Sequence, residues 1–134
     1  LGGCLIKSDY KIVAFSDGDI VFHSIADAIL GACQEGDIGL AFPDNNKANK
    51  NLDSKIILNY AIKKMKQHKL KINNIDITIV CEKIMIKPLR VRIINNLTKL
   101  LKTRNINLKA TRFEQDLQLI ECDTIVSLDR SKNG

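Results

Sequence analysis

Apolar residues recur at helical spacing in three segments of the chain, and we expect a helix in each. In residues 19–33, 53–69 and 87–103 the apolar positions lie three or four apart, as on the buried face of an amphipathic helix. Asp53 or Ser54 is a suitable N-cap for the second helix, and Pro88 falls in the first turn of the third. The three faces consist of Ile20, Val21, Ile25, Ala28 and Ile29; of Ile57, Leu58, Ala61, Ile62 and Met65; and of Val91, Ile94, Leu97 and Leu101.

Alternating patterns predict the strands. Isoleucine alternates with polar or smaller residues through 74–82, which is typical of a half-buried strand. Short apolar segments predict further strands at 9–14, 106–112 and 117–128. We therefore expect an α+β fold, a two-layer sandwich with the helices on one face of a mixed four-stranded sheet.

The last predicted strand bears on assembly. Thr124, Val126 and Leu128 alternate with Ile125 and Ser127 in an apolar stretch. A sheet that is covered by helices on one face needs another partner for its second face when that face is apolar. We expect that face to be buried against neighbouring copies of the chain.

Length and charge narrow the class of protein. At 134 residues the chain is long enough for one domain with its own core. The formal net charge is +6, but many lysines fall on or just after the helix at 53–69, where a solvated face explains them. The composition has no aromatic platform for stacking bases, so we expect no nucleic-acid partner. The lysines on or just after the helix at 53–69 are Lys63, Lys64, Lys66, Lys69 and Lys71.

Neither a membrane span nor a cysteine motif is expected. No apolar run approaches the roughly 18–20 residues that a membrane helix needs. Cys4, Cys33, Cys81 and Cys122 are isolated from one another, which argues against a zinc ribbon or a redox pair. Free thiols of this kind indicate a reducing compartment.

The segment at 16–31 carries an acidic and histidine-containing pattern with two interpretations. Gly18 between two aspartates predicts a tight turn, and Asp19 is a suitable N-cap for the helix that follows. His23 and Asp27 are four residues apart and share a helix face. Either Asp27 bonds a partly buried structural His23, or His23 binds a divalent metal through one ring nitrogen while a carboxylate orients the other.

Residues 35–52 form a long predicted loop that is rich in Gly, Asp, Asn and Pro. One interpretation is an ordinary structureless loop. The other is a substrate loop, whose backbone amides and Asp side chains bind hydroxyls or phosphates. Long loops in compact domains are often functional, which keeps the second interpretation open.

Taken together, the segments at 16–31 and 35–52 contain a pattern that is specific to one protein family. The run Ser-Asp-Gly-Asp-x-x-x-His-x-x-x-Asp-Ala-x-Leu-Gly, followed by Gly-Asp-Ile-Gly-x-x-Phe-Pro-Asp, closely resembles the 2-C-methyl-D-erythritol 2,4-cyclodiphosphate synthases of the non-mevalonate isoprenoid pathway. The resemblance continues through residues 74–80 and 107–114 and covers nearly the whole chain.

The resemblance implies an enzyme, a phosphorus–oxygen lyase that acts as a homotrimer with active sites between subunits. It implies conversion of 4-diphosphocytidyl-2-C-methyl-D-erythritol 2-phosphate to the cyclic diphosphate plus CMP. It also implies a Zn²⁺ ion and a second divalent ion, Mg²⁺ or Mn²⁺. The expected location is a bacterial cytoplasm or a plastid-type organelle.

The resemblance assigns roles to individual residues. His23 resembles the zinc ligand on the first helix, and Glu114 resembles the ligand of the second metal. The positions that stabilise the transition state are Phe15, Thr111 and Arg112. The substrate-binding positions are Ser16, Asp37, Gly39, Phe42, Pro43, Asp44, Asn46, Cys81, Glu82, Lys83 and Thr111, of which Cys81 to Lys83 hold the cytosine ring by backbone contacts.

The chain departs from the family's pattern at several of these positions. Phe15 stands where the family has a histidine, and Arg112 stands in a stretch where the family places a hydroxyl on phosphate. Residues 1–134 are expected to form one domain that lacks the family's N-terminal strand with its Asp-x-His zinc ligands. An alternative is therefore a catalytically impaired trimeric nucleotide-binding or assembly module of the same fold.

Overall fold

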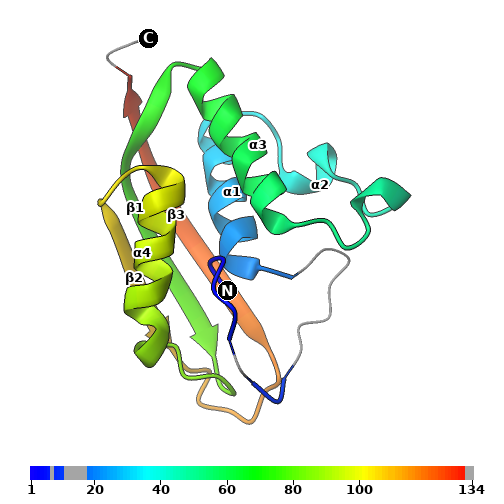
Figure 1. Cartoon of the computed structure of the whole chain (residues 1–134), viewed down its shortest axis with the longest axis vertical. Coiled ribbons are helices and arrows are strands. Elements are labelled where there is room, and N and C mark those ends of the chain that lie inside the picture. Colours follow the sequence, from blue (N-terminus) through cyan, green and yellow to red (C-terminus); the bar gives the residue numbers. More distant parts are fainter. Residues whose placement is uncertain (7, 11–17, 132–134) are drawn as a thin grey trace.

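The computed structural model describes residues 1–6, 8–10 and 18–131, and Figure 1 shows how their helices and strands are arranged. The three expected helices are all present, although each is shorter than predicted. In chain order the elements are α1 (Ile20–Ala32), α2 (Ile38–Ala41), the 3₁₀ turn η1 (Lys47–Asn49), α3 (Ser54–Gln67), β1 (Leu70–Cys81), the 3₁₀ turn η2 (Lys87–Leu89), α4 (Arg90–Leu101), β2 (Ile106–Thr111) and β3 (Ile120–Arg130).

The predicted structureless loop at 35–52 is wrong, because it contains α2 and η1. Both turns begin at a side chain that caps them. The Asp37 carboxylate accepts a hydrogen bond from the backbone N–H of Leu40, and the Asn46 side chain accepts one from Ala48. Capping of the first free N–H groups is what allows such short helical turns to form. Pro88 lies in η2, just before α4 rather than inside it.

The described residues form a three-stranded sheet in the order β2-β1-β3. The sheet is mixed, since β1 pairs in parallel with β2 and antiparallel with β3. The fourth strand expected at 9–14 falls largely on residues 11–14, outside the described residues. The α+β class and the mixed sheet are therefore confirmed for the part of the chain that the structure describes.

A β-bulge explains why β1 begins four residues earlier than predicted. Ile72 lies opposite Leu128 and Asn74 lies opposite Ser127, so Asn73 is an extra residue in the strand. An extra residue shifts the alternation by one position and keeps Ile72 on the same face as the isoleucines that follow. The two consecutive asparagines hide this continuation from a simple alternating pattern.

The core lies between the helices and one face of the sheet, and Figure 1 shows α1, α3 and α4 on the same side of the strands. Ile75, Ile77 and Ile79 of β1 have no exposed surface, and neither do Ile25 of α1 and Leu97 of α4. Complete burial of one such side chain stabilises the fold by about 1.5–3 kcal/mol. The predicted alternation in this strand is confirmed.

The other face of the three-stranded sheet is largely polar. Lys109 donates to Asp76 Oδ2 at 2.7 Å and Asn107 donates to Asp76 Oδ1 at 3.0 Å, and these hydrogen bonds lower the pKa of Asp76. Val126 and Leu128 pack on the helix side with the core. Val126 and Leu128 therefore belong to the core, whereas alternation places Ile125, which is 74% exposed, on the open face. Burial of that face against neighbouring copies stays a prediction.

The start of α1 is held by one carboxylate. Asp19 is the N-cap and accepts a hydrogen bond from the backbone N–H of Phe22. The same carboxylate accepts from the backbone N–H of Gly2 at 2.8 Å and of Gly3 at 2.7 Å. Gly3 has a φ of +79°, and a Cβ there would clash with the side chain of Asn96. Only glycine fits this turn without strain.

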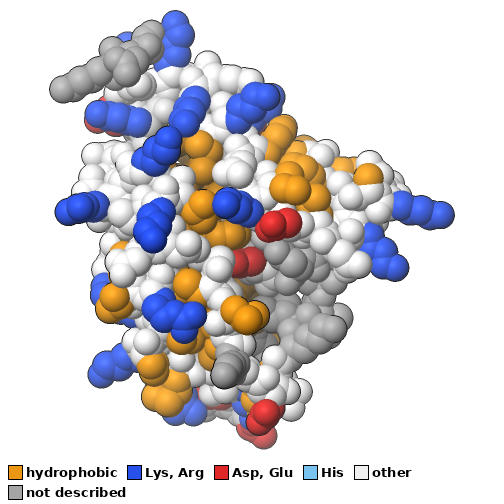
Figure 2. Space-filling view, in the orientation of Figure 1, with side chains coloured by type: hydrophobic (Ala, Val, Ile, Leu, Met, Phe, Trp, Pro, Cys, Tyr) orange, Lys and Arg blue, Asp and Glu red, His pale blue; other side chains and the backbone are white. Residues whose placement is uncertain are grey.

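The surface agrees with the interpretation of the lysines as a solvated face. Lys63, Lys66, Lys69 and Lys71 are exposed. Figure 2 shows Lys and Arg side chains spread over this side of the molecule rather than gathered in one patch. Among the described helices, none has the length and apolar character required to cross a membrane. All four cysteines are free thiols.

Candidate active site

His23 lies at the contact between α1 and α3. Its Nε2 atom is 2.8 Å from the hydroxyl oxygen of Ser54, the first residue of α3. Ser54 has no exposed surface, and His23 is partly buried. Asp53 caps α3 through the backbone N–H of Lys55, which fixes where Ser54 begins the helix. The imidazole is therefore held at a defined position at the N-terminal end of both helices.

Asp27 has a different role from the one that its spacing suggested. Its carboxylate accepts a hydrogen bond from the backbone N–H of Ile38 at 2.9 Å, which joins α1 to the first residue of α2. A hydrogen bond between His23 and Asp27 is not among the contacts of the described residues. His23 and Asp27 do lie on the same side of α1, but Asp27 holds the start of α2, in the segment predicted to be a substrate loop, rather than the imidazole.

The segment after α2 is packed against α3. Phe42 meets the ring of Tyr60 edge to face, with ring centroids 5.3 Å apart and an interplanar angle of 82°. The carbonyl oxygen of Pro43 accepts a hydrogen bond from the side chain of Asn49 at 2.8 Å. The polar members of this predicted substrate loop stay exposed to solvent; they are Asp37, Gly39, Asp44 and Asn46.

A second set of predicted residues gathers where two parallel strands end. Val80 lies opposite Thr111 in the register of β1 and β2, so the residues that follow the two strands emerge side by side. Arg112 donates through Nε to Glu82 Oε2 at 2.6 Å. Cys81 is buried directly before Glu82, as expected for an isolated cysteine in an apolar strand.

Glu82 also holds the turn that follows β2. Its Oε1 atom accepts from the backbone N–H of Gln115 at 3.1 Å. Burial alone raises the pKa of Glu82, but the hydrogen bond and charge of Arg112 and the backbone N–H groups of Gln115 and Glu114 outweigh it, so the pKa is lowered. Glu114 has a left-handed backbone with a φ of +60°. The carboxylate of Glu82 thus stabilises an unfavourable turn.

Lys83 and Asp116 form an ion pair beside this turn. The hydrogen bond between them raises the pKa of Lys83 and lowers that of Asp116. A pocket of about 530 Å³ lies here. Its lining consists of Glu82, Lys83, Arg112, Glu114, Gln115 and Asp116. The pocket has the size of a ligand site and carries both a guanidinium and carboxylates.

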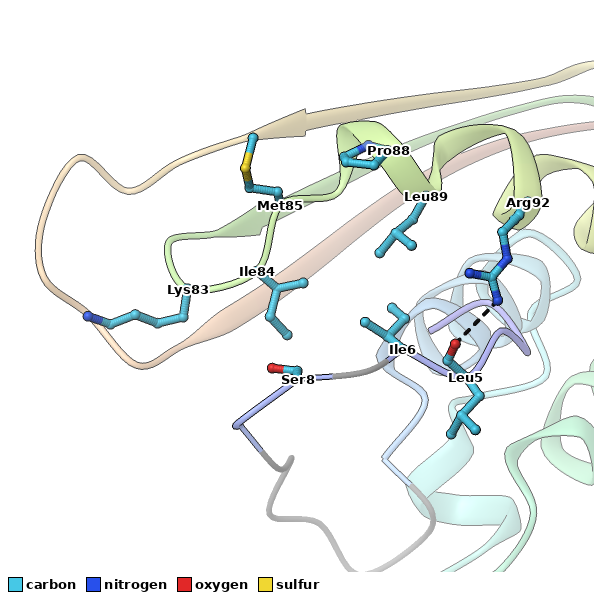
Figure 3. Close-up of a pocket in the computed structure, with 9 residues that line it drawn as sticks. All are labelled: Leu5, Ile6, Ser8, Lys83, Ile84, Met85, Pro88, Leu89 and Arg92. Atoms are coloured by element: carbon cyan, nitrogen blue, oxygen red, sulfur yellow. Dashed lines mark hydrogen bonds between the residues drawn. The ribbon is translucent and has the colours of Figure 1, made fainter.

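A more apolar pocket of about 590 Å³ shares Lys83 with the first (Figure 3). Ile84, Met85 and Leu89 line it, and Arg92 donates to the carbonyl oxygen of Leu5 at 3.3 Å across one end. This pocket extends from the segment that was predicted to hold the cytosine ring. Sequence reasoning did not anticipate its apolar walls.

The predicted site residues that the structure describes therefore form two groups on the chain. The helix group contains His23, Asp37 and the loop to Asn46; the strand-end group contains Cys81–Lys83, Thr111, Arg112 and Glu114. In Figure 1, α2 lies to one side of α1 and α3, whereas the arrowhead of β1 points to the lower end of the view; β2 runs parallel to β1 and ends beside it. Phe15 and Ser16 lie outside the described residues.

The described residues do not assemble a metal centre on their own. Within residues 1–6, 8–10 and 18–131 there is no group of three or more His, Cys, Asp or Glu side chains placed to hold an ion. A catalytic zinc site requires about three protein ligands. His23 offers one nitrogen, which contacts Ser54 here, and Glu114 offers one exposed carboxylate. Single donors of this kind do not complete either expected site.

Comparison with known proteins points to a single family. The model of the YgbB family matches residues 1–128. The 2-C-methyl-D-erythritol 2,4-cyclodiphosphate synthase of Mycoplasmoides gallisepticum is 42% identical over 98% of this chain and 85% of that protein. The enzyme of the same name from Leptospira interrogans is 44% identical over 86% of this chain and 73% of its own length.

Solved structures show the same relationship. A structure of 2C-methyl-D-erythritol-2,4-cyclodiphosphate synthase superposes with a TM-score of 0.88 at 29% identity and covers 96% of this chain and 87% of that one. A CDP complex of IspF from Plasmodium falciparum superposes with a TM-score of 0.77 at 32% identity, over 90% of this chain and 76% of that one.

Proposed function

This chain belongs to the YgbB family, and on that premise we propose that it is a 2-C-methyl-D-erythritol 2,4-cyclodiphosphate synthase. The observation that carries the proposal is the 42% identity to an enzyme of that name along 98% of the chain. The proposed substrate is 4-diphosphocytidyl-2-C-methyl-D-erythritol 2-phosphate. The products are the cyclic diphosphate and CMP.

The reaction is an intramolecular phosphoryl transfer. An oxygen of the 2-phosphate forms a bond to the β-phosphorus, and the bond from that phosphorus to the bridging oxygen breaks. CMP leaves with the bridging oxygen. Such reactions depend mainly on holding the two phosphates in line and on neutralising their charge.

In this proposal the strand-end group binds the nucleotide half of the substrate. The backbone of Cys81 to Lys83 holds the cytosine, while Thr111 and Arg112 contact the diphosphate. The 530 Å³ pocket supports this assignment, because it is lined by Lys83, Arg112 and Glu114. A guanidinium matches phosphate oxygens through paired N–H donors, so Arg112 serves in place of a hydroxyl.

The helix group binds the methylerythritol half, with Asp37 directed to its hydroxyls. We propose that the helix group of one subunit faces the strand-end group of its neighbour in a homotrimer. The separation of α2 from the arrowhead of β1 in Figure 1 supports this arrangement. Ser16 and the loop from Gly39 to Asn46 would then border the sugar phosphate. Phe15 contributes no hydrogen bond to the reaction.

The expected Zn²⁺ and Mg²⁺ or Mn²⁺ ions remain part of the proposal, with His23 and Glu114 as one donor each. A divalent ion supplies charge neutralisation on phosphate oxygens when it is bound. The described residues do not complete either site. The roles proposed above are therefore assigned only to side chains and backbone groups of the chain, and no step is assigned to the ions.

The test is CMP release from the diphosphocytidyl substrate with zinc and magnesium added. The purified chain should release one CMP per cyclic product, and Arg112→Ala should lower kcat/KM about a hundredfold, because it removes charged phosphate contacts worth about 1.5–3 kcal/mol. Arg104→Ala is a matched control, since Arg104 is exposed in the turn before β2 and lies outside both groups. Absence of metal-dependent CMP release would refute the proposal.

A further inference from the structure

The most constrained side chain of the strand-end group is a carboxylate rather than a cation. Glu82 is only 8% exposed, whereas its partner Arg112 is 72% exposed. A carboxylate so placed needs hydrogen-bond donors to offset its lost hydration. Arg112 and two successive backbone N–H groups, those of Glu114 and Gln115, supply them. Glu82 is thus a fixed point around which the turn after β2 is arranged.

The way in which Arg112 meets Glu82 leaves most of the guanidinium available. The guanidinium has five N–H donors, of which the contact to Glu82 uses the one on Nε. Among the described contacts, Arg112 meets the carboxylate through Nε at Oε2, while Oε1 accepts from the backbone N–H of Gln115. The Nη groups therefore belong to the exposed end of the side chain, at the pocket that Arg112 lines.

We propose that Glu82 is a positioning residue that aims the Nη groups of Arg112 at the diphosphate of a cytidine nucleotide and sets the backbone turn at Glu114. This inference rests on the proposed function and extends it. It accounts for the arginine in a stretch where a hydroxyl was expected, because an arginine without a fixed partner is a long and flexible cation. Held by Glu82, it loses less conformational entropy when an anion binds.

Neighbouring groups fit this arrangement. Lys83 and Arg112 are the two cations among the described lining residues of the pocket. Lys83 is paired with Asp116 and is 24% exposed, whereas Arg112 is 72% exposed, so Arg112 is the more accessible of the two. We therefore expect a preference for diphosphate over monophosphate, because a diphosphate carries more negative charge and more phosphate oxygens for the guanidinium to bind.

The experiment measures CDP and CMP binding by calorimetry, with Mg²⁺ present, for the wild type and for Glu82→Gln, Arg112→Ala and the double variant. Gln keeps the acceptor for the Gln115 N–H but removes the charge that holds Arg112. We expect each single variant to weaken CDP binding about tenfold and CMP binding by less than about twofold. The double variant should be no weaker than Arg112→Ala, because both changes remove the same contact.

Glu35→Gln is the matched control and should bind CDP as the wild type does. A thermal melt shows whether Glu82→Gln remains folded, and Glu82→Asp, which is too short to reach Arg112, should share the CDP defect in a folded protein. If the variants weakened CDP binding and CMP binding equally, or if the effects of the two changes were additive in the double variant, the positioning role of Glu82 would be overturned while the proposed function would stand. A wild type that binds neither nucleotide would overturn the proposed function together with this inference.

Discussion

The carboxylate of Asp19 joins three parts of the chain, and its removal gives a quantitative test of the fold. It caps α1 through Phe22 and accepts from the backbone N–H groups of Gly2 and Gly3. Its side chain is only 10% exposed. Asp53 is the natural comparison, because it caps α3 through Lys55 and is exposed. Both residues are N-caps, but only Asp19 also anchors the first residues of the chain.

The expected cost of Asp19→Ala follows from these contacts. Loss of an N-cap costs about 1 kcal/mol. The Gly2 N–H is buried with its residue, and loss of its charged acceptor costs about 1.5–3 kcal/mol more. The exposed Gly3 N–H regains water and adds little. We expect about 3 kcal/mol for Asp19→Ala against about 1 kcal/mol for Asp53→Ala.

Urea unfolding followed by circular dichroism measures both values, at one protomer concentration because assembly contributes to stability. In thermal melts the two variants should lose about 10 °C and about 3 °C respectively. Asp19→Asn keeps one acceptor oxygen, so its loss of melting temperature should lie between the losses of the two alanine variants. Equal destabilisation of the two alanine variants would refute the reasoning, since it would mean that the contacts to Gly2 and Gly3 contribute nothing.

Three further predictions concern the core, the glycine turn and pH. Leu97→Ala should destabilise the protein by about 2–5 kcal/mol in urea unfolding, because Leu97 is fully buried; exposed Leu40 changed to Ala should cost far less. Gly3→Ala should lower the melting temperature by several degrees, because φ is +79° and a Cβ meets Asn96; an unchanged melt would contradict the strained turn. Glu35 accepts from His68 at 2.7 Å, and this hydrogen bond lowers its pKa below 4.5. The stability that this hydrogen bond contributes is present above the usual pKa of glutamate and is lost as pH falls through the lowered folded pKa. The melting temperatures of the wild type and Glu35→Gln should therefore differ at neutral pH, and the difference should shrink as pH falls through the acid range.

Much of the fold follows from local sequence patterns. The caps at Asp19 and Asp53 were readable as Asp before an apolar run. The face predicted for α4 was wrong at Val91, which is 66% exposed, because the buried face passes through Ile93, Leu97 and Leu101 instead. Helix ends differ from the predicted ranges by one to three residues because fraying and 3₁₀ turns do not appear in periodicity. The turns α2 and η1 were missed, although Asp37 and Asn46 carried the same capping signal, because each turn is too short to show a periodic pattern.

Partners of side chains were less predictable than elements. His23 and Asp27 share a helix face, yet α3 brings Ser54 to the imidazole and α2 brings the Ile38 N–H to Asp27. Both partners depend on tertiary packing, which spacing does not encode. The Glu82 and Arg112 contact spans thirty positions. It follows from the parallel register of β1 and β2, which aligns their ends, but that register was not available from the sequence.

The position of β1 in the middle of the sheet has a consequence for how the protein is made. From Ile75 to Val80 its backbone pairs with β2 on one side and with β3 on the other. The segment β1-α4-β2 leaves the ribosome before β3, so one side of β1 remains unpaired until β3 has emerged. Amide hydrogens of β1 that face β3 should therefore gain protection from exchange last during synthesis, and those that face β2 should gain it earlier.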